Sequence, residues 1–549
     1  MLILGAGING AALARELAWQ GVPVVVVDRA DISSGATAYS SRLIHGGLRY
    51  LEYGDFRLVA EALAERRRLL ATAPHHVKPL RLMIPVARRL GGLLAGGLRF
   101  IGRERWARRF AGLRGLWVIR AGLAFYDYLA RDPQLPRAAV QLVGAAHTPA
   151  IAPGVAHWWC SYFDAQIAWP ERYVIDLLED GRIASVQFGQ RFEVITYARA
   201  ELNDAETSIF NRQGNLVARF KPSAIVNATG AWVDQTLNQL HVDSPQLMGG
   251  TKGSHLVVDN PRLRQWLGKD GIYVEAADGR PVFILPWDDL TLVGTTDLPF
   301  TGDPVDVVAT PPEIDYLLAA VNHLLPGWQL QPHDVLLHYC GVRPLPATSA
   351  STPAAISRAH WLEEHLNATV PTYSVIGGKL TTSRSLAESA CDTLLTRLNL
   401  SRRHSTRDAV LPSSRGYPPD RAMISTQINY LAERHGLSIE TVAAVWNLFG
   451  TRTSHILEHA RDVDDRTLLS GTLLPRRVVA WVIEHEWAES LDDLIERRLL
   501  LLYDRGLCRE TLGDLAALLV ERGKLDPRDV DSTIEGTRER IRQRHGRVI

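Results

Sequence analysis

The residues with the clearest capacity for chemistry lie at the start of the chain. The pattern G-A-G-I-N-G occupies 5–10, directly after an apolar run at 2–4. Helix-forming residues follow at 11–19, and a second apolar run at 22–27 stops at an acid, Asp28. Strand, glycine turn, helix, strand and acid in this order form the fingerprint of a dinucleotide-binding βαβ unit, in which the helix N-terminus faces the pyrophosphate and the acid faces a ribose.

Three later segments could bring backbone close to the same ligand. Small and hydroxyl residues fill 33–53, which contains a Gly-Gly pair; an apolar strand at 224–230 ends in A-T-G; and G-G-K-L-T-T at 377–382 precedes a helix. Contacts spread so widely along the chain suit an extended flavin dinucleotide better than an exchangeable nicotinamide, and a flavin would bring redox chemistry.

Cationic and hydrogen-bonding side chains stand beside these glycine loops. Guanidinium groups offer paired donors that match phosphate oxygens, so an anionic substrate is indicated. The alternative for any one of them is an ordinary ion pair. The candidates are Arg49, Tyr50, His255, Arg343, Arg358 and Lys379.

Composition limits the classes of function. A chain of 549 residues is too long for one core, so two or three domains are expected. The net charge of +1 provides no bulk attraction to nucleic acid. The four cysteines lack metal-ligand spacing, which predicts reduced thiols and no metal site. No apolar run reaches the ~18 residues of a membrane span. The first strand begins so abruptly that we expect the true start to lie upstream.

One segment, 81–120, is strongly basic. It holds ten arginines, no lysine and a single acid, Glu104, with leucine, phenylalanine and tryptophan interleaved. This composition favours an anionic membrane surface, and the alternative is a solvated basic helix pair. Strand-rich residues at 245–345 predict an antiparallel sheet. The chain from 421 onwards is expected to be helical, with one long helix over 484–504 and a structural or oligomerisation role.

Seven segments taken together resemble the FAD-dependent glycerol-3-phosphate dehydrogenases. The resemblance extends over nearly the whole chain and keeps the order of the motifs. They are G-A-G-I-N-G-A at 5–11, S-S-R-L-I-H-G-G-L-R-Y-L-E at 40–52, N-A-T-G-A-W-V at 227–233, K-G-S-H at 252–255, G-T-T-D at 294–297, G-V-R-P-L at 341–345 and G-G-K-L-T-T at 377–382.

The resemblance implies an α/β fold with a glutathione-reductase-like FAD-binding lobe, a β-rich substrate lobe and a C-terminal helical domain. The implied FAD-binding domain comprises 1–75, 157–240 and 341–400. A substrate- and membrane-facing domain would comprise 76–156 and 241–340, with a linker at 401–420 before the helical domain at 421–549.

The implied reaction is oxidation of sn-glycerol 3-phosphate to dihydroxyacetone phosphate, with hydride passing to flavin N5 and electrons to a membrane quinone. The alternatives are an oxidase of the same fold that uses oxygen, and a related FAD-dependent amine or amino-acid oxidase. The implied catalytic residues are His255, Arg343, Lys379, Arg49 and Tyr50, with His255 as base and Arg343 as its rival. The implied substrate-binding residues are Arg343, Arg358, Thr295, Arg49, Tyr50 and Lys379. The implied FAD contacts are Gly5, Gly7, Ile8, Asn9, Gly10, Asp28, Ser40, Ser41, Gly46, Gly47, Val194, Ala228, Gly230, Gly378, Lys379, Leu380 and Thr381.

The expected partners are glycerol 3-phosphate, a membrane quinone and an anionic membrane surface that binds the 81–120 stretch, with no nucleic acid. We further expect a homodimer in the cytoplasm, attached peripherally to the inner face of the cell membrane.

Overall fold

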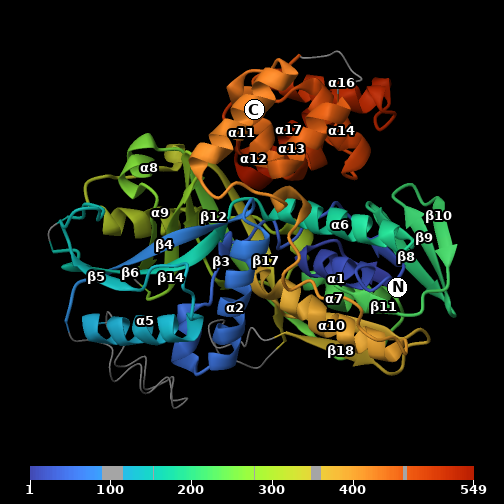
Figure 1. Cartoon of the computed structure of the whole chain (residues 1–549), viewed down its shortest axis with the longest axis horizontal. Coiled ribbons are helices and arrows are strands. Elements are labelled where there is room, and N and C mark those ends of the chain that lie inside the picture. The colour runs from blue at the N-terminus through green and yellow to red at the C-terminus, as the bar shows by residue number, and fades with distance from the viewer. Residues whose placement is uncertain (90–114, 153, 277, 348–359, 461–466) are drawn as a thin grey trace.

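The computed structural model describes residues 1–89, 115–152, 154–276, 278–347, 360–460 and 467–549 (Figure 1). In this part of the chain the glycine turn belongs to a six-stranded sheet with the order β18-β19-β11-β1-β2-β7. Its neighbouring strands are parallel except for the β18–β19 pair. The strands are β1 (Leu2–Leu4), β2 (Val24–Val27), β7 (Phe192–Ile195), β11 (Ile225–Asn227), β18 (Trp361–His365) and β19 (Thr372–Ile376).

Both faces of this sheet are covered, which explains why its strands read as continuous apolar runs. Side chains alternate between faces along a strand. Ile3 and Val26 therefore pack against one set of helices, whereas Leu4 and Val27 pack against a β-meander and a short helix. The first set is α1 (Ile8–Ala18), α6 (Pro170–Gln187) and α10 (Ser383–Arg397); the second comprises β8 (Ala198–Asn203), β9 (Glu206–Asn211), β10 (Leu216–Phe220) and α7 (Val233–Gln239).

A second, ten-stranded sheet forms the other lobe. Its order is β16-β12-β15-β14-β13-β4-β6-β3, with β17 paired to β12 and β5 paired to β6. The pairing is antiparallel apart from β4 with β13. The strands are β3 (Leu43–Ile44), β4 (Val77–Val86), β5 (Ala139–Leu142), β6 (Trp158–Ile167), β12 (Met248–Val258), β13 (Gly271–Glu275), β14 (Pro281–Trp287), β15 (Leu290–Gly294), β16 (Leu298–Pro299) and β17 (Val335–Pro346). The helices α2 (Phe56–Thr72), α5 (Leu116–Ala130), α8 (Pro261–Leu267) and α9 (Pro311–Leu324) accompany it.

Two of the predicted domain boundaries fall inside this second sheet. The predicted boundary at 157 is followed by β6, which pairs with β4 over ten residues. The predicted boundary at 341 divides β17, which pairs with β12 along most of its length. Residues 158–167 and 335–346 are therefore strands of the second sheet, although the prediction placed 157–240 and 341–400 in the FAD-binding domain.

The C-terminal part packs on the second sheet, at the upper edge of Figure 1. Its apolar side chains share one core with that sheet: Leu501 and Tyr503 belong to the same cluster as Trp287 and Tyr339. The helices are α11 (Arg421–His435), α12 (Ile439–Phe449), α13 (Thr453–His459), α14 (Arg476–His485), α15 (Leu491–Asp493), α16 (Arg509–Glu521) and α17 (Val530–His545).

The single long helix predicted over 484–504 is wrong. Helix α14 ends at His485, Ser490 caps a new helical turn, and a π-helical turn follows at Leu494–Arg498. Leu500 then has a φ of 59°, outside the helical range. The chain breaks here because Arg498 turns inward: its Nε donates to the carbonyl oxygen of Glu486 at 2.7 Å, and its two Nη atoms reach Asp31.

Other predicted segments differ in detail. Residues 81–86 of the basic stretch belong to strand β4, and Arg81 pairs with Asp270 at 2.5 Å. Most of the remaining stretch, 90–114, lies outside the described residues. The predicted linker 401–420 is irregular but packed, because the backbone N–H of Ser413 donates to Asp176. No helix among the described residues is both long and apolar enough to cross a bilayer.

The buried Asp31–Arg498 ion pair should contribute to the free energy of unfolding. Both side chains are buried, and the two Nη atoms of Arg498 donate to the carboxylate at 2.7 and 2.8 Å. Burial alone would raise the pKa of Asp31, but Arg498 and Arg497 bring it below its usual value. Replacing Arg498 with Met should therefore lower the free energy of unfolding by about 3 kcal/mol, since the buried carboxylate loses one of its two arginine partners. Urea denaturation measures this change.

The matched control is Arg528→Met, whose arginine pairs with Asp526 on the surface and is 88% exposed. This control should leave the unfolding free energy essentially unchanged, because solvent screens an exposed ion pair. Equal effects of the two substitutions would contradict a structural role for the buried pair.

Candidate functional site

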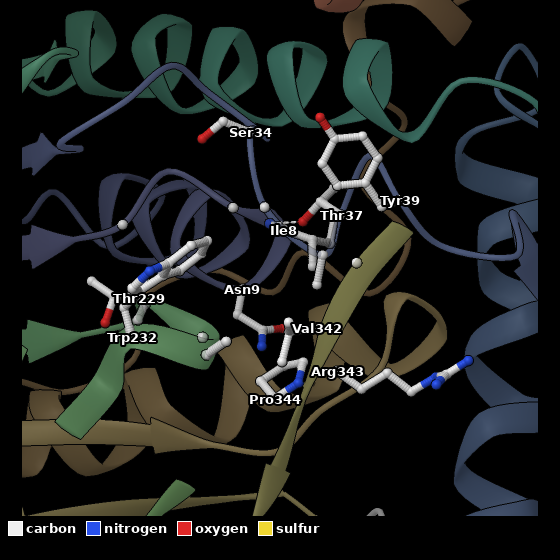
Figure 2. Close-up of a pocket in the computed structure, with 18 of the residues that line it drawn as sticks. Ile8, Asn9, Ser34, Thr37, Tyr39, Thr229, Trp232, Val342, Arg343 and Pro344 are labelled. Atoms are coloured by element: carbon white, nitrogen blue, oxygen red, sulfur yellow. Dashed lines mark hydrogen bonds between the residues drawn. The ribbon is translucent and has the colours of Figure 1, made fainter. Parts of the chain in front are cut away.

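A cavity of about 400 Å³ opens between the two sheets. It is lined by the turn after β1, the end of β2, the 34–45 loop, the middle of β12, the C-terminal half of β17 and the turn at 377–381. Figure 2 shows Ser34, Thr37 and Tyr39 on one side of the cavity and Val342 and Pro344 on the opposite side. Segments far apart in sequence therefore meet in one site.

The first end of the cavity is the glycine turn. Gly5 has a φ of 101°, and a Cβ there would lie 2.7 Å from the carbonyl oxygen of Ala228. A Cβ on Gly10 would lie 1.9 Å from the carbonyl oxygen of Gly5. Only glycine therefore permits this tight turn. Helix α1 begins with no side-chain cap, and the N–H of Ile8 donates to Thr37 at 3.1 Å. The helix N-terminus beside the cavity suits an anionic group.

Asp28 stands at the end of β2, as the fingerprint predicts. Its carboxylate accepts hydrogen bonds from the N–H groups of Ala6 at 2.7 Å and Ala30 at 2.9 Å. Burial raises the pKa of Asp28, although these two N–H groups oppose the rise. A carboxylate can accept about four hydrogen bonds, so Asp28 keeps acceptor capacity where it borders the cavity.

Asn9 and Gly378 complete this end. The amide nitrogen of Asn9 donates to the carbonyl oxygen of Gly377 at 3.4 Å. Its buried Oδ1 has no hydrogen-bond partner among the described residues, and Asn9 lines the cavity. Gly378 has a φ of 95°, and a Cβ there would lie 3.0 Å from the Asn9 amide. A glycine turn, an acid at the end of β2 and an orphaned polar atom fit an extended dinucleotide such as FAD.

The second end of the cavity is one face of the β12–β17 pair. In the antiparallel register His255 opposes Tyr339, Gly253 opposes Gly341, and Thr251 opposes Arg343. Residues two apart on a strand share a face, so these side chains point the same way. The two opposed glycines leave a slot: a Cβ on Gly341 would lie 2.8 Å from the Tyr39 Cβ, and one on Gly253 would overlap the Arg343 guanidinium.

His255 is held on two sides. Its Nε2 lies 2.9 Å from Ser41 Oγ, and its ring stacks on Tyr339 with centroids 4.9 Å apart and planes at 24°. The Nδ1 atom is buried without a hydrogen-bond partner among the described residues. Burial, with the nearby guanidinium groups of Arg343 and Arg42, keeps the pKa of His255 well below its usual value. The imidazole is therefore neutral near pH 7 and can accept a proton.

Arg343 lies across the same face. Its guanidinium donates to Thr295 Oγ1 at 2.9 Å, to the Thr296 carbonyl oxygen at 3.0 Å and to Asp297 at 3.0 Å. The Arg343 side chain keeps 19% of its surface exposed, so it can still meet a ligand. Lys379 adds a second cation from the glycine turn, with its Nζ 3.9 Å above the Tyr50 ring.

The structure brings most of the predicted site residues to this one cavity. Those that line it are Gly5, Gly7, Ile8, Asn9, Asp28, Ser40, Ser41, Tyr50, Ala228, Gly230, His255, Arg343, Gly378, Lys379, Leu380 and Thr381. Thr295 reaches the site indirectly, as the hydrogen-bond acceptor from Arg343. Arg358 and the side chain of Arg49 lie outside the described residues.

Four predicted cofactor contacts do not line the cavity. Gly10 lies behind the turn, packed against Gly5. Gly46 is enclosed by Tyr126 and Leu63, and Gly47 by the Tyr50 ring, so both glycines make room for side chains. Val194 lies on β7, where it pairs with Val26 inside the sheet.

Sequence reasoning missed several lining residues. The loop residues Ser34, Thr37 and Tyr39 lie in a run of small and hydroxyl residues that was noted without singling them out. Trp232 follows the A-T-G motif. Arg544, from helix α17, also lines the cavity and lies over the Tyr39 ring at 5.2 Å. No signal in the sequence connects Arg544 with residues so distant in the chain.

The family comparison covers most of the chain. The family model described as FAD dependent oxidoreductase matches residues 1–383. A protein from Synechocystis sp. named glycerol-3-phosphate dehydrogenase is 33% identical, with 91% of this chain and 88% of that protein covered. The aerobic glycerol-3-phosphate dehydrogenase of Escherichia coli is 32% identical, with 91% and 93% covered. A D-erythritol 1-phosphate dehydrogenase of Brucella abortus is 30% identical, also with 91% and 93% covered.

A solved structure shows the same fold. The glycerol-3-phosphate dehydrogenase of Bacillus halodurans, complexed with FAD, aligns with a TM-score of 0.73 at 19% identity. The alignment covers 99% of this chain and 94% of that one. The resemblance drawn from the motifs is thereby confirmed, and the chain belongs to the FAD-dependent oxidoreductase family, within the group that includes the glycerol-3-phosphate dehydrogenases.

Proposed function

We propose that this protein oxidises sn-glycerol 3-phosphate to dihydroxyacetone phosphate with FAD as its cofactor and passes the electrons to a membrane quinone. The observation that supports this most directly is that one cavity joins the dinucleotide-binding turn to the face that carries His255 and Arg343. Relatives that align over most of the chain are named for this activity.

Arg343 and Lys379 are proposed to bind the anionic groups of the substrate. Arg343 has two guanidinium nitrogens already engaged with Thr295 and Asp297, which fixes the plane of the group before substrate arrives. A phosphate or a developing alkoxide would meet a preorganised donor. Lys379, Tyr50, Arg49 and Thr295 would surround the glycerol end, and Arg358 would assist at the phosphate.

The second role is proton removal from the secondary hydroxyl. His255 is neutral near pH 7 and is oriented by Ser41 and Tyr339, so its imidazole can take the hydroxyl proton. FAD, when bound, supplies the acceptor for the hydride at its N5 atom. The secondary hydroxyl loses its proton to His255, and the carbon that bears this hydroxyl loses hydride. The product is the ketone of dihydroxyacetone phosphate.

The substrate could also be a phosphorylated polyol longer than glycerol. One relative of equal coverage is named for D-erythritol 1-phosphate. Both compounds carry a phosphate and a secondary alcohol, and Arg343 and Lys379 could bind the phosphate of either. A panel of phosphorylated polyols therefore belongs in the test of substrate class.

The lobes take matching roles in this proposal. The six-stranded sheet would form a glutathione-reductase-like FAD lobe, the ten-stranded sheet the substrate lobe, and residues 421–549 a C-terminal helical domain. The homodimer and the cytoplasmic, inner-face location stay predictions.

Helix α5 supports peripheral membrane attachment. Only Leu123 and Tyr126 of this helix are buried, whereas Trp117 is 54% and Tyr128 62% exposed. Arg120 lies over the Trp117 ring and Arg131 over the Tyr128 ring, so cations accompany the exposed aromatics. Figure 1 shows α5 at the edge away from the C-terminal helices, and α5 includes residues 116–120 at the end of the basic stretch. Aromatic and basic side chains together suit the headgroup region of an anionic bilayer.

The cofactor prediction concerns Gly10. Replacing Gly10 with Ala should weaken FAD binding about 10- to 100-fold, because the new Cβ would meet the Gly5 carbonyl oxygen and force the turn to shift. The ratio of flavin to protein absorbance in purified protein, and FAD titration after its removal, measure the effect. The control is Gly513→Ala on α16, where a Cβ meets nothing. Unchanged flavin content in the Gly10 variant would contradict a role for the glycine turn at 5–10 in binding FAD.

The substrate prediction concerns Arg343. Adding glycerol 3-phosphate under anaerobic conditions should bleach the flavin, and Arg343→Ala should raise the half-saturating concentration at least about 30-fold, because a phosphate would lose its paired donor. Arg219→Ala on β10, where the arginine is 55% exposed, should behave like wild type. Absence of bleaching by any polyol phosphate would sink the proposed reaction, and hydrogen peroxide formed without a quinone requirement would indicate an oxidase.

The membrane prediction concerns α5. Trp117→Ser combined with Tyr128→Ser should reduce binding to vesicles of anionic phospholipid about tenfold or more, because two interfacial aromatics are lost. Co-sedimentation with vesicles measures the bound fraction. The control is Tyr430→Ser on α11, where the tyrosine is 51% exposed. Equal binding by all three proteins would show that α5 does not touch the bilayer.

A further inference from the structure

Arg42 is a charged side chain that the proposed mechanism does not use, yet it is wholly buried beside the active site. It has no exposed surface. Four aromatic rings surround its guanidinium and form what we call the Arg42 cage. Their centroids lie at 4.4 Å for Trp287, 5.3 Å for Tyr503, 5.5 Å for Trp169 and 5.8 Å for Tyr339. These residues come from four distant parts of the chain.

The guanidinium is also hydrogen-bonded in several directions. It donates to both carboxylate oxygens of Glu171, at 3.0 and 2.8 Å, and to the hydroxyl oxygen of Tyr503 at 3.1 Å. It donates further to the carbonyl oxygens of Ala168 at 2.7 Å and Ala38 at 3.2 Å. A buried charge is tolerated only when it is paired and hydrogen-bonded, and Arg42 meets that condition with a fixed geometry.

This fixed group is connected to His255 by two short routes. Ser41, the residue next to Arg42 in the chain, has its Oγ 2.9 Å from His255 Nε2. Tyr339, one wall of the cage, stacks on the His255 ring and donates its hydroxyl to the Ser40 carbonyl oxygen at 3.0 Å. The two contacts that orient the imidazole therefore both depend on the 40–42 segment that Arg42 anchors.

Tyr503 is the only C-terminal member of the cage among the described residues. It packs against Trp287 and Trp169, with ring centroids 4.7 and 5.4 Å away. Its backbone belongs to the broken segment that follows Arg498, so the irregular turn at 494–503 is what brings this ring to Arg42.

We propose that Arg42 and Tyr503 are positioning residues for His255, so that the C-terminal helices supply part of the support for catalysis. The inference rests on the proposed function, in which His255 takes the hydroxyl proton. Loss of the Tyr503 hydroxyl removes one hydrogen bond to the guanidinium and loosens the 40–42 segment. The substrate phosphate is held by other residues, so its binding should be little affected.

The test is Tyr503→Phe, which keeps the ring and removes the hydroxyl. Anaerobic stopped-flow mixing with glycerol 3-phosphate, or with whichever polyol phosphate reduces the wild type, gives the limiting rate of flavin reduction and the half-saturating concentration. We expect the limiting rate to fall about three- to tenfold, because small misplacements of a catalytic group are costly. The half-saturating concentration should stay within about twofold, as expected when transition-state contacts alone are disturbed.

The matched control is Tyr197→Phe. The Tyr197 hydroxyl also binds the C-terminal part, at Asp493 and at Ser490 3.2 Å away, but Tyr197 contacts neither Arg42 nor His255 in any described interaction. This variant should leave the limiting rate within about twofold of wild type. A similar fall in both variants would indicate general loosening of the C-terminal part and would overturn the proposal.

A double-mutant cycle distinguishes positioning from stability. If Tyr503 acts through Ser41 and His255, then Tyr503→Phe should add little to the rate loss of Ser41→Ala, because coupled residues are not additive. Additive losses, or an unchanged rate in Tyr503→Phe, would overturn the proposal.

Arg42→Lys is a second variant: it keeps the charge but not the forked donors, so its limiting rate should also fall. Failure of wild-type flavin to bleach with any polyol phosphate would instead reject the proposed function.

Discussion

The site depends on the pairing register of β12 with β17. That register sets Gly253 opposite Gly341 and places His255 and Arg343 on the same face at either side of the resulting gap. A slip of one residue would send every one of these side chains to the other face. Two side chains fill the gap: Tyr39 packs against Gly341, and the Arg343 guanidinium lies over Gly253. A loop of the dinucleotide lobe thus packs into a sheet of the other lobe, which fixes the distance between them.

Charge is balanced differently at the two ends of the cavity. At the dinucleotide end, the half-buried Asp28 accepts hydrogen bonds from two backbone N–H groups, which partly offset its desolvation. At the other end, Arg343 has Asp297 as its carboxylate partner, and Lys379 lies against the Tyr50 ring. Arg343 thus stays neutralised without substrate. In the proposed function an incoming phosphate would add a second anion to this region and would not have to compensate for an unpaired charge, so the substrate-free site would be stable.

Much of this architecture could be predicted from sequence because its signals are local. The turn at Gly5 to Gly10, the acid at the end of β2 and the Gly377-Gly378 turn each occupy a few consecutive residues, and each lies where the pattern places it. Gly46 and Gly47 show the limit of such reasoning. A Gly-Gly pair signals a close approach, but the sequence does not say whether ligand or protein comes close, and here it is Tyr126, Leu63 and Tyr50.

Long-range arrangement could not be predicted in the same way. The acidic and arginine-rich segment 484–504 was predicted as one long helix. Its arginines are instead buried partners of Asp31, some 460 residues earlier in the chain, at separations that no local pattern encodes. The same burial explains why the helix breaks, since Arg498 also bonds the carbonyl oxygens of Glu486 and Trp487.

The C-terminal helices are therefore integral to the site and not an appendage. They reach it at three points: Arg498 at Asp31 after β2, Tyr503 at the Arg42 cage, and Arg544 over Tyr39 at the cavity wall. Each point touches the loop between Asp28 and Arg42, the segment that also contacts the start of α1 through Thr37. That loop contains many small residues and has little core of its own. Buried arginines supply the rigidity that its own side chains cannot, because a multiply bonded guanidinium fixes the backbone carbonyls and carboxylates around it.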